Sequence, residues 1–248
     1  MTFAPTGQGG TRATMMEQMS AASRKPPKVC YRCGLVVTTK TREHVVPRCL
    51  YPDEPAANLL TVPACRDCNN AFARDEEYFR LFLTAHWIPS PAARTVWEQK
   101  VRPSFERGWD GLRKLAVADM RDFYLPSGTG FVRTGLLKGD AARMDRVAEK
   151  IVRALYYHVT DKVMPPEAKM NFHWRPPAWA PDTARRGGLI TVDPAIFLCR
   201  YIIGSRGSVE RSAWWMLFYE SLMYVVTAEA PARLTGDERA EGRVVECA

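Results

Sequence analysis

The stretch that decides the fold reads Cys30-Tyr31-Arg32-Cys33 at its start, Glu43-His44-Val45-Val46-Pro47 in its middle and Cys65-Arg66-Asp67-Cys68 at its end. Two closely spaced thiol pairs can supply the four thiolates of the closed tetrahedral site that structural Zn²⁺ prefers. The segment between the pairs would then be a loop held at its base. The sequence therefore predicts a zinc site formed by Cys30, Cys33, Cys65 and Cys68.

Two disulfides are the alternative interpretation of these four cysteines. Residues 1–28 contain no apolar stretch of the kind that begins a secreted protein, which favours zinc over an oxidised framework. The other cysteines, Cys49, Cys199 and Cys247, have no CxxC partner and are interpreted as buried or incidental free thiols.

The residues between the cysteine pairs suit hydrolysis of a phosphodiester, which needs a base to activate water and a divalent cation to neutralise charge on phosphate. Glu43 and His44 supply both residue types side by side. Neighbouring residues of a strand point to opposite faces, so the pair requires a turn or the end of a hairpin, and Pro47 favours such a place.

Asparagines supply the remaining candidates. Asn58 precedes the apolar run 59–62, and Asn69 and Asn70 follow Cys68 where a helix is expected to start. Asn at a helix start is typically an N-cap, so a cap and a metal ligand both remain open for Asn69. Oxygen ligands from Glu43 and Asn69 would suit Mg²⁺ or Mn²⁺.

In this order, the segments CYRCG, EHVVP and NLLTVPACRDCNN resemble the HNH endonuclease family in its zinc-stapled form. The resemblance covers about residues 29–79. It implies a ββα-metal fold, with His44 as the general base and with Glu43 and Asn69 as ligands of one catalytic divalent cation, usually Mg²⁺. Asn58 would fill the middle Asn position and orient the His44 loop.

The chain departs from the family pattern in two places. Glu43 stands where members often have Asp or His, and Phe72 stands where a basic residue often follows, which removes one expected phosphate contact. Asn70 is an alternative to Asn69 as ligand.

Composition favours a polyanionic partner, since the 248-residue chain carries a formal net charge of +8 and 26 of its 35 basic residues are Arg. Arg-rich usage from genome base composition is the alternative. Between Lys28 and Arg80 eight basic residues stand against seven acidic ones, so the excess lies on the flanks. No apolar run approaches the ~20 residues of a membrane span, and we expect a cytoplasmic protein.

The predicted fold class is α+β. A disordered tail (1–27) precedes a small ββα-metal, treble-clef-like nuclease module (28–88), a larger accessory domain of helices and an antiparallel sheet (89–234), and a flexible tail (235–248). The accessory domain is expected to select nucleic acid, bind a protein partner or form a homodimer.

Apolar periodicity predicts the main elements. Helices are expected over 75–87, over 91–120 with an interruption near Pro103, and over 140–163; a hairpin is expected over 125–139. Strands are expected over 189–192, 196–203 and 214–226, although 214–218 also fits a buried helix. His86 and His158 are interpreted as packed side chains, with catalysis for His86 and base stacking for His158 as alternatives.

The sequence thus predicts an endonuclease that hydrolyses DNA, with structural Zn²⁺ and catalytic Mg²⁺ or Mn²⁺. A zinc-binding nucleic-acid or protein adaptor without catalysis is one alternative. An HNH toxin that cleaves RNA is another, because such a site reads phosphate and not the 2′-hydroxyl.

Overall fold

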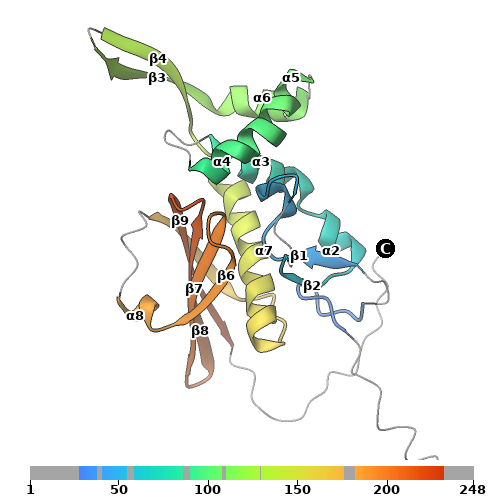
Figure 1. Ribbon diagram of the computed structural model, residues 1–248. Helices are drawn as coiled ribbons and strands as arrows, with labels where there is room; N and C mark the ends of the chain where they lie inside the picture. The colour runs from blue at the N-terminus through green and yellow to red at the C-terminus, as the bar shows by residue number, and fades with distance from the viewer. Residues whose placement is uncertain are drawn as a thin grey trace, which may run out of the picture.

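The computed structural model describes residues 28–37, 41–54, 59–85, 90–107, 110–128, 130–175 and 182–231. The two predicted tails (1–27 and 235–248) lie outside these residues, as do Asn58, His86 and Cys247. Figure 1 shows the long helix α7 (Ala141–Thr160) between a five-stranded antiparallel sheet and the segment that carries the cysteine pairs. The predicted α+β class with an antiparallel sheet is confirmed.

The cysteine-bearing segment is built on a short antiparallel hairpin. Strand β1 (Arg42–His44) pairs with β2 (Thr61–Pro63), with Glu43 opposite Val62. A tight turn carries the first cysteine pair, and the Gly34 nitrogen donates to the Cys30 carbonyl at 3.0 Å. Gly34 has φ +75°, a conformation that favours glycine, so CxxCG closes this turn without strain.

Two short helices complete this segment. The 3₁₀ helix η1 (Arg48–Leu50) follows Pro47, and α2 (Arg66–Asn70) follows β2. The Tyr31 nitrogen donates to the Pro63 carbonyl at 3.0 Å, so the first cysteine turn lies beside the end of β2 from which the second pair begins.

Helix α7 begins and ends at capping residues. The Asp140 carboxylate accepts a hydrogen bond from the Arg143 nitrogen at 3.2 Å, and Asp161 closes the helix with φ 54°. Its apolar positions, which recur every three or four residues, are buried between α3 (Ala73–Thr84) and the sheet. The helix predicted over 140–163 is confirmed. The helix predicted over 75–87 corresponds to α3, which begins two residues earlier, at Ala73.

The sheet is formed by β5 (Lys169–Arg175), β6 (Gly188–Asp193), β7 (Phe197–Arg206), β8 (Val209–Phe218) and β9 (Leu222–Pro231). Its strand order is β5-β9-β8-β7-β6, and all its pairs are antiparallel. The segment 214–226 forms parts of two strands joined at Tyr219 and Glu220, which both have positive φ. The helical alternative for 214–218 is wrong, because this run pairs on both edges. The short helix α8 (Asp182–Arg185) precedes β6 in the chain.

The helical run before α7 contains Pro103 without a break. Helix α4 (Pro91–Val96) passes into a π-helical segment η2 (Trp97–Val101) and then into α5 (Arg102–Glu106), where Pro103 lies in the first turn. The helix type changes before Pro103, and the expected interruption lies just after it, where α5 ends at Glu106 and Arg107 forms a turn. Helix α6 (Asp110–Asp119) follows.

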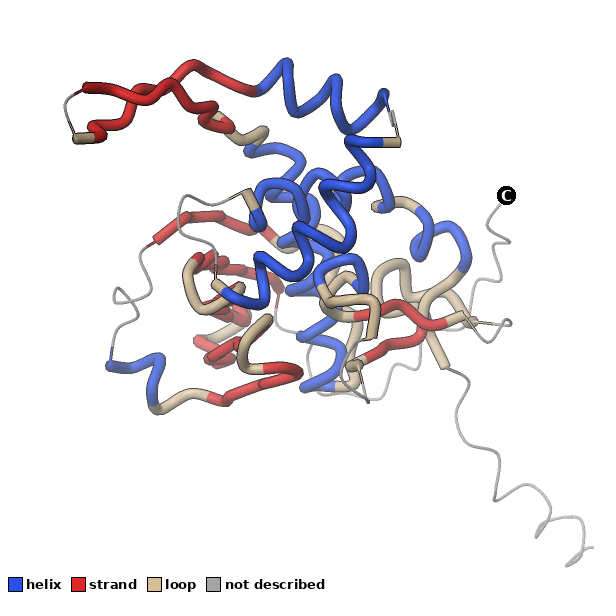
Figure 2. Tube along the Cα trace, turned by 45° about the horizontal axis from the view of Figure 1, so that its top comes forward, coloured by secondary structure: helices blue, strands red, loops and turns tan. Residues whose placement is uncertain are grey.

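A two-stranded arm connects α6 to α7. Strands β3 (Met120–Ser127) and β4 (Gly130–Leu137) pair antiparallel, which confirms the predicted hairpin and extends it toward the N-terminus. Figure 2 shows the arm extending away from the other elements. Tyr124 and Phe131, near its tip, are exposed.

One cluster of buried apolar side chains joins the cysteine-bearing segment, α3, α7 and the sheet, and it includes Tyr31, Val45, Phe79, Ile151 and Trp214. The division at residue 88 stays a prediction. Within the described chain, no helix combines the length and apolar composition needed to cross a membrane.

Candidate functional site

The four predicted zinc ligands come together. Their sulfur atoms all lie within 4.8 Å of one another, and Cys33 Sγ is 3.8 Å from Cys65 Sγ. In a tetrahedral zinc site with Zn–S bonds of about 2.3 Å, neighbouring sulfurs are about 3.8 Å apart. The cluster could therefore bind a zinc ion. The disulfide alternative does not hold, because these cysteines are free thiols.

The thiols perturb one another as closely packed ligands do. A hydrogen bond with Cys68 lowers the pKa of Cys30 to about 4, whereas the same bond raises the pKa of Cys68. Burial raises the pKa of Cys33 to about 12. A divalent cation would offset the cost of ionising these closely packed thiols.

Glu43 is the central residue of β1, and its side chain lies in the interior. Only 6% of the residue is exposed, and its Oε1 accepts a hydrogen bond from Lys150 Nζ at 2.7 Å. Lys150 projects from α7, is fully buried and also donates to Glu76 on α3. Burial raises the pKa of Glu43, and the Lys150 ammonium opposes that shift.

Asn69 contacts the other oxygen of the same carboxylate. With its amide nitrogen facing them, Asn69 donates to Glu43 Oε2 at 3.2 Å and to the Arg42 carbonyl at 3.1 Å. The N-cap of α2 is Cys65, and Asn69 lies in the last turn of that helix, so the cap interpretation is wrong. The neighbouring Asn70 is exposed.

His44 is the last residue of β1, and the chain bends directly after it. The strand places buried Glu43 and half-buried His44 on opposite faces, as the alternation of side chains requires. Burial lowers the pKa of His44, and the positive charges of Lys150 and Arg48 lower it further. At neutral pH the imidazole is therefore neutral and can accept a proton.

Three residues of this site were missed at the level of sequence. Lys150 and Glu76 lie far from Glu43 along the chain, and Arg48 lies exposed on η1 next to His44. One signal was available for Lys150, since it stands three residues after Val147 on the apolar face of α7. A charged residue at such a position calls for a buried partner.

Phe72 lies against a positively charged side chain. The Arg32 guanidinium, from the first cysteine turn, lies 4.4 Å from the centre of the Phe72 ring. This cation–π contact holds the Arg32 side chain against α2 and α3 at the Phe72 ring.

The remaining described thiols fit their interpretation as free thiols, whereas His158 does not fit its own. Cys199 is fully buried, and burial raises the pKa of Cys49 to about 12. The Cys49 thiol contacts the Glu76 carbonyl at 3.6 Å. His158, in the last turn of α7, is exposed, so its interpretation as a packed side chain is wrong: the helix turns this position toward solvent.

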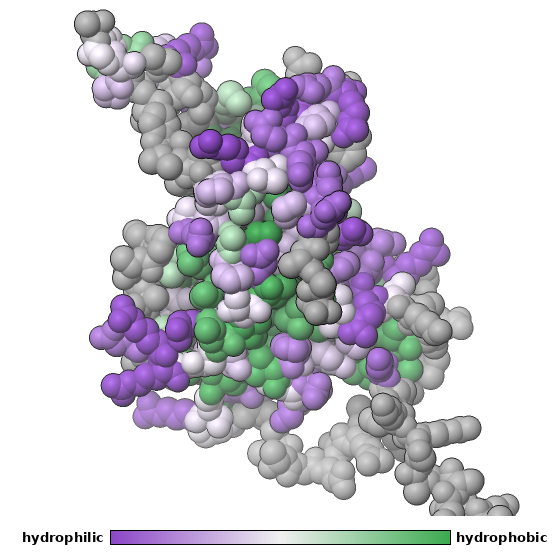
Figure 3. Space-filling model, in the orientation of Figure 1, coloured by the Kyte–Doolittle hydropathy of each residue, from purple (hydrophilic) through white to green (hydrophobic). Residues whose placement is uncertain are grey.

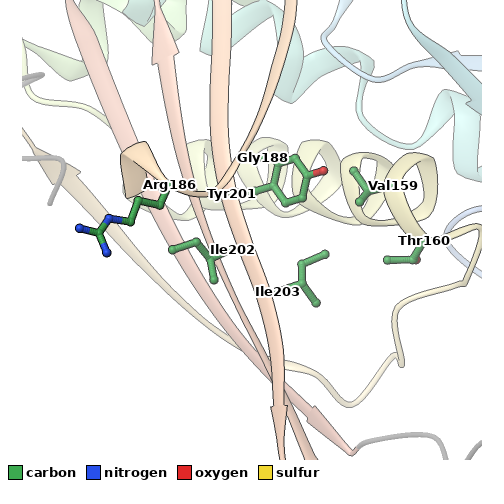
Figure 4. A pocket seen from close by; sticks show the side chains of 8 residues that line it. Val159, Thr160, Arg186, Gly188, Tyr201, Ile202 and Ile203 are labelled. Carbon is green, nitrogen blue, oxygen red and sulfur yellow. The ribbon is translucent and has the colours of Figure 1, made fainter. Parts of the chain in front are cut away.

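A separate open groove of about 600 Å³ lies between the end of α7 and strands β6 and β7. Figure 3 shows hydrophobic side chains gathered where α7 lies over the sheet, and in Figure 4 the Arg186 guanidinium points away from the other labelled side chains. No predicted site residue lines this groove, whose lining is Val159, Thr160, Arg186, Gly187, Gly188, Tyr201, Ile202 and Ile203.

Among the described residues, the four cysteines are the only group of three or more His, Cys, Asp or Glu side chains close enough to share a metal ion. A second cation would therefore depend on Glu43 together with the Asn69 amide. Comparison with known proteins adds no relative, because no protein-family model, curated protein or solved structure matches this chain.

Proposed function

We propose that this chain is a metal-dependent endonuclease of the HNH type that hydrolyses phosphodiester bonds of DNA. Its ββα-metal, treble-clef-like module would be held by zinc at the four clustered cysteines. The observation that carries the proposal is the contact between Asn69 and Glu43, next to His44, on a hairpin whose base carries that cluster. This arrangement brings a carboxylate, an amide and an imidazole together on one short hairpin.

His44 would act as the general base. Its imidazole makes no hydrogen bond to other described residues, and its lowered pKa keeps the ring neutral at the pH of the cell. A neutral imidazole that is half-exposed can take a proton from an attacking water. Arg48, exposed beside it, would contact a phosphate of the substrate backbone.

Glu43 and Asn69 would hold the divalent cation. In the hydrogen-bonded orientation the Asn69 nitrogen is 3.2 Å from Glu43 Oε2, and turning the amide would present an oxygen beside that carboxylate. Carboxylate and amide oxygens are ligands that Mg²⁺ takes in proteins. The two residues therefore fit a hard cation. When bound, Mg²⁺ or Mn²⁺ would neutralise the charge that develops on the phosphate.

One observation favours a second candidate, a zinc-binding adaptor without catalysis. Lys150 already neutralises part of the Glu43 charge, which weakens the case for a cation there. The adaptor would keep the stapled hairpin and bind nucleic acid or protein.

Plasmid cleavage tests the proposal. The full-length protein, after its zinc content has been measured, is incubated with supercoiled DNA and Mg²⁺, Mn²⁺ or EDTA, beside the His44→Ala variant and a matched RNA substrate. Cleavage of DNA by the wild type alone, and only with added divalent cation, supports the proposal. Cleavage of RNA alone would replace DNA by RNA, and no cleavage of either substrate would favour the adaptor.

A further inference from the structure

A buried lysine lies at the centre of the candidate site. Lys150 Nζ is fully buried, 2.7 Å from Glu43 Oε1, and it also contacts the Glu76 carboxylate. It belongs to α7, whereas both carboxylates belong to the first third of the chain. Burying an ammonium is costly unless acidic partners surround it, so this contact is a built feature of the core.

The two oxygens of Glu43 have different partners. Oε1 faces the Lys150 ammonium, and Oε2 faces the Asn69 amide, where the proposed divalent cation would bind. Any cation at Oε2 therefore shares one carboxylate with a fixed positive charge on its other side. Charges a few ångströms apart in a protein interior repel strongly, because little water screens them.

The charge of the cluster points in the same direction. Glu43, Glu76 and Lys150 together carry one formal net negative charge, and Arg48 is a further positive charge that acts on His44. Mg²⁺ and Mn²⁺ hold their waters firmly and rely on carboxylates or substrate phosphates to replace them. A phosphate would add the negative charge that the protein side lacks.

We propose that Lys150 is the resident cation of the Glu43 site and that it keeps the affinity for a divalent cation low until a substrate phosphate arrives. This inference rests on the proposed function, since it assumes that Glu43 and Asn69 take a divalent cation. Lys150 acts through Glu43 and is not a catalytic residue. It makes binding of the catalytic cation depend on the polyanionic substrate.

Titration with Mn²⁺ tests this inference on the zinc-loaded, full-length protein without DNA. Free Mn²⁺ is followed by the electron paramagnetic resonance signal of the hydrated ion. Lys150→Met removes the resident charge and should bind Mn²⁺ about tenfold or more tightly than the wild type. Glu76→Gln removes the second carboxylate that pairs with Lys150, so the ammonium pairs with Glu43 alone. This variant should bind Mn²⁺ more weakly than the wild type.

Arg146→Met is the matched control. Arg146 lies one turn earlier on α7, where it pairs with Asp75 at 2.8 Å with half its side chain exposed. The control removes one positive charge from the same helix without touching Glu43 and should change Mn²⁺ affinity less than about twofold, because solvent screens it. Lys150→Arg keeps the charge and should remain near the wild type.

Tighter Mn²⁺ binding by Lys150→Met together with weaker Mn²⁺ binding by Glu76→Gln supports the inference. Equal or weaker Mn²⁺ binding by folded Lys150→Met overturns it. If that variant does not fold, Glu76→Gln decides, and unchanged or tighter binding overturns the inference. If the wild type cleaves DNA with Mn²⁺ but Lys150→Met has the Mn²⁺ affinity of the wild type, the inference is overturned and the proposed function stands. Absence of both Mn²⁺ binding and cleavage in every variant would remove the two together.

Discussion

Glu43 and His44 are neighbours in the chain and stand in different electrostatic environments. Glu43 is buried against an ammonium and an amide, whereas His44, half-exposed, lies near two positive charges that disfavour its protonation. The alternation of a strand separates the two side chains, and the bend after β1 leaves His44 at its end. One short strand thus supplies a fixed carboxylate and a neutral imidazole.

At the residue scale, His44→Ala should abolish cleavage and leave the fold intact. The side chain is half-buried and has no hydrogen-bond partner among the described residues, so its loss leaves no buried polar group unpaired. Loss of a general base typically costs a factor of ~10² to ~10⁴ in rate. The measurement is the initial rate of plasmid cleavage with Mg²⁺, with zinc content and circular dichroism as controls. Normal turnover by the variant would exclude His44 as the base.

At the element scale, the base of the arm is fastened to α3 by one tyrosine. The Tyr78 hydroxyl donates to Asp119 at the end of α6 and accepts from the Asp140 nitrogen at 2.7 Å, at the start of α7. Asp119 also accepts from the Gly139 nitrogen at 2.8 Å. Both ends of the arm therefore meet at a single hydrogen-bonded junction.

This junction should weaken at high pH. Burial and the Asp119 carboxylate raise the pKa of Tyr78 from 10 to about 12. Because the folded state binds this proton more tightly, the contribution to stability is complete below pH 10 and is lost as the pH rises through 12. The difference in unfolding free energy between wild type and Tyr78→Phe, measured with urea, should be constant below pH 10 and shrink above it. A difference that stays constant to pH 12 would contradict this account.

The tip of the arm should be dispensable for folding. Replacing residues 124–133 by a short Gly-Ser turn removes exposed Tyr124 and Phe131 and leaves the Tyr78 junction in place. The thermal midpoint of unfolding should change little, because surface changes usually cost less than ~0.5 kcal/mol. A large drop in the midpoint, measured by circular dichroism, would show that the tip packs on the body.

Sequence patterns predicted those elements whose apolar residues repeat over a long run. Helix α7 has such a run with capping residues at both ends, and the arm has glycines between two apolar stretches. Strand β5 was missed although Met170, Phe172 and Trp174 alternate, because the run is short and polar between them. The division of 214–226 depends on left-handed Tyr219 and Glu220, which are not residues that a turn pattern requires.

At the scale of the whole molecule, the cysteine cluster shares its core with the rest of the chain. Cys30 and Tyr31 belong to the same buried cluster as Ile151 of α7 and Trp214 of the sheet. Tyr219 at the end of the sheet donates to the Leu50 carbonyl at 2.6 Å. The predicted module 28–88 therefore has an extensive apolar face against later elements.

A fragment of residues 28–88 should accordingly fail to fold even with one equivalent of zinc. Separation would expose the α3 side chains that pack on α7 and would leave Glu43 without Lys150. Amide proton dispersion in a two-dimensional NMR spectrum of the zinc-loaded fragment is the measurement. A well-dispersed spectrum would instead support the predicted domain boundary.

The sequence alone determined the local chemistry: the two CxxC pairs, the adjacent Glu43 and His44, and the amphipathic helix before the sheet. These features are local because metal spacing, strand alternation and helical period involve near neighbours in the chain. Only the tertiary structure decided that Asn69 rather than Asn70 meets Glu43 and that Lys150, 107 residues away, holds the same carboxylate. Such contacts depend on how α7 packs against the hairpin, and no short-range pattern specifies the partner of a buried charge.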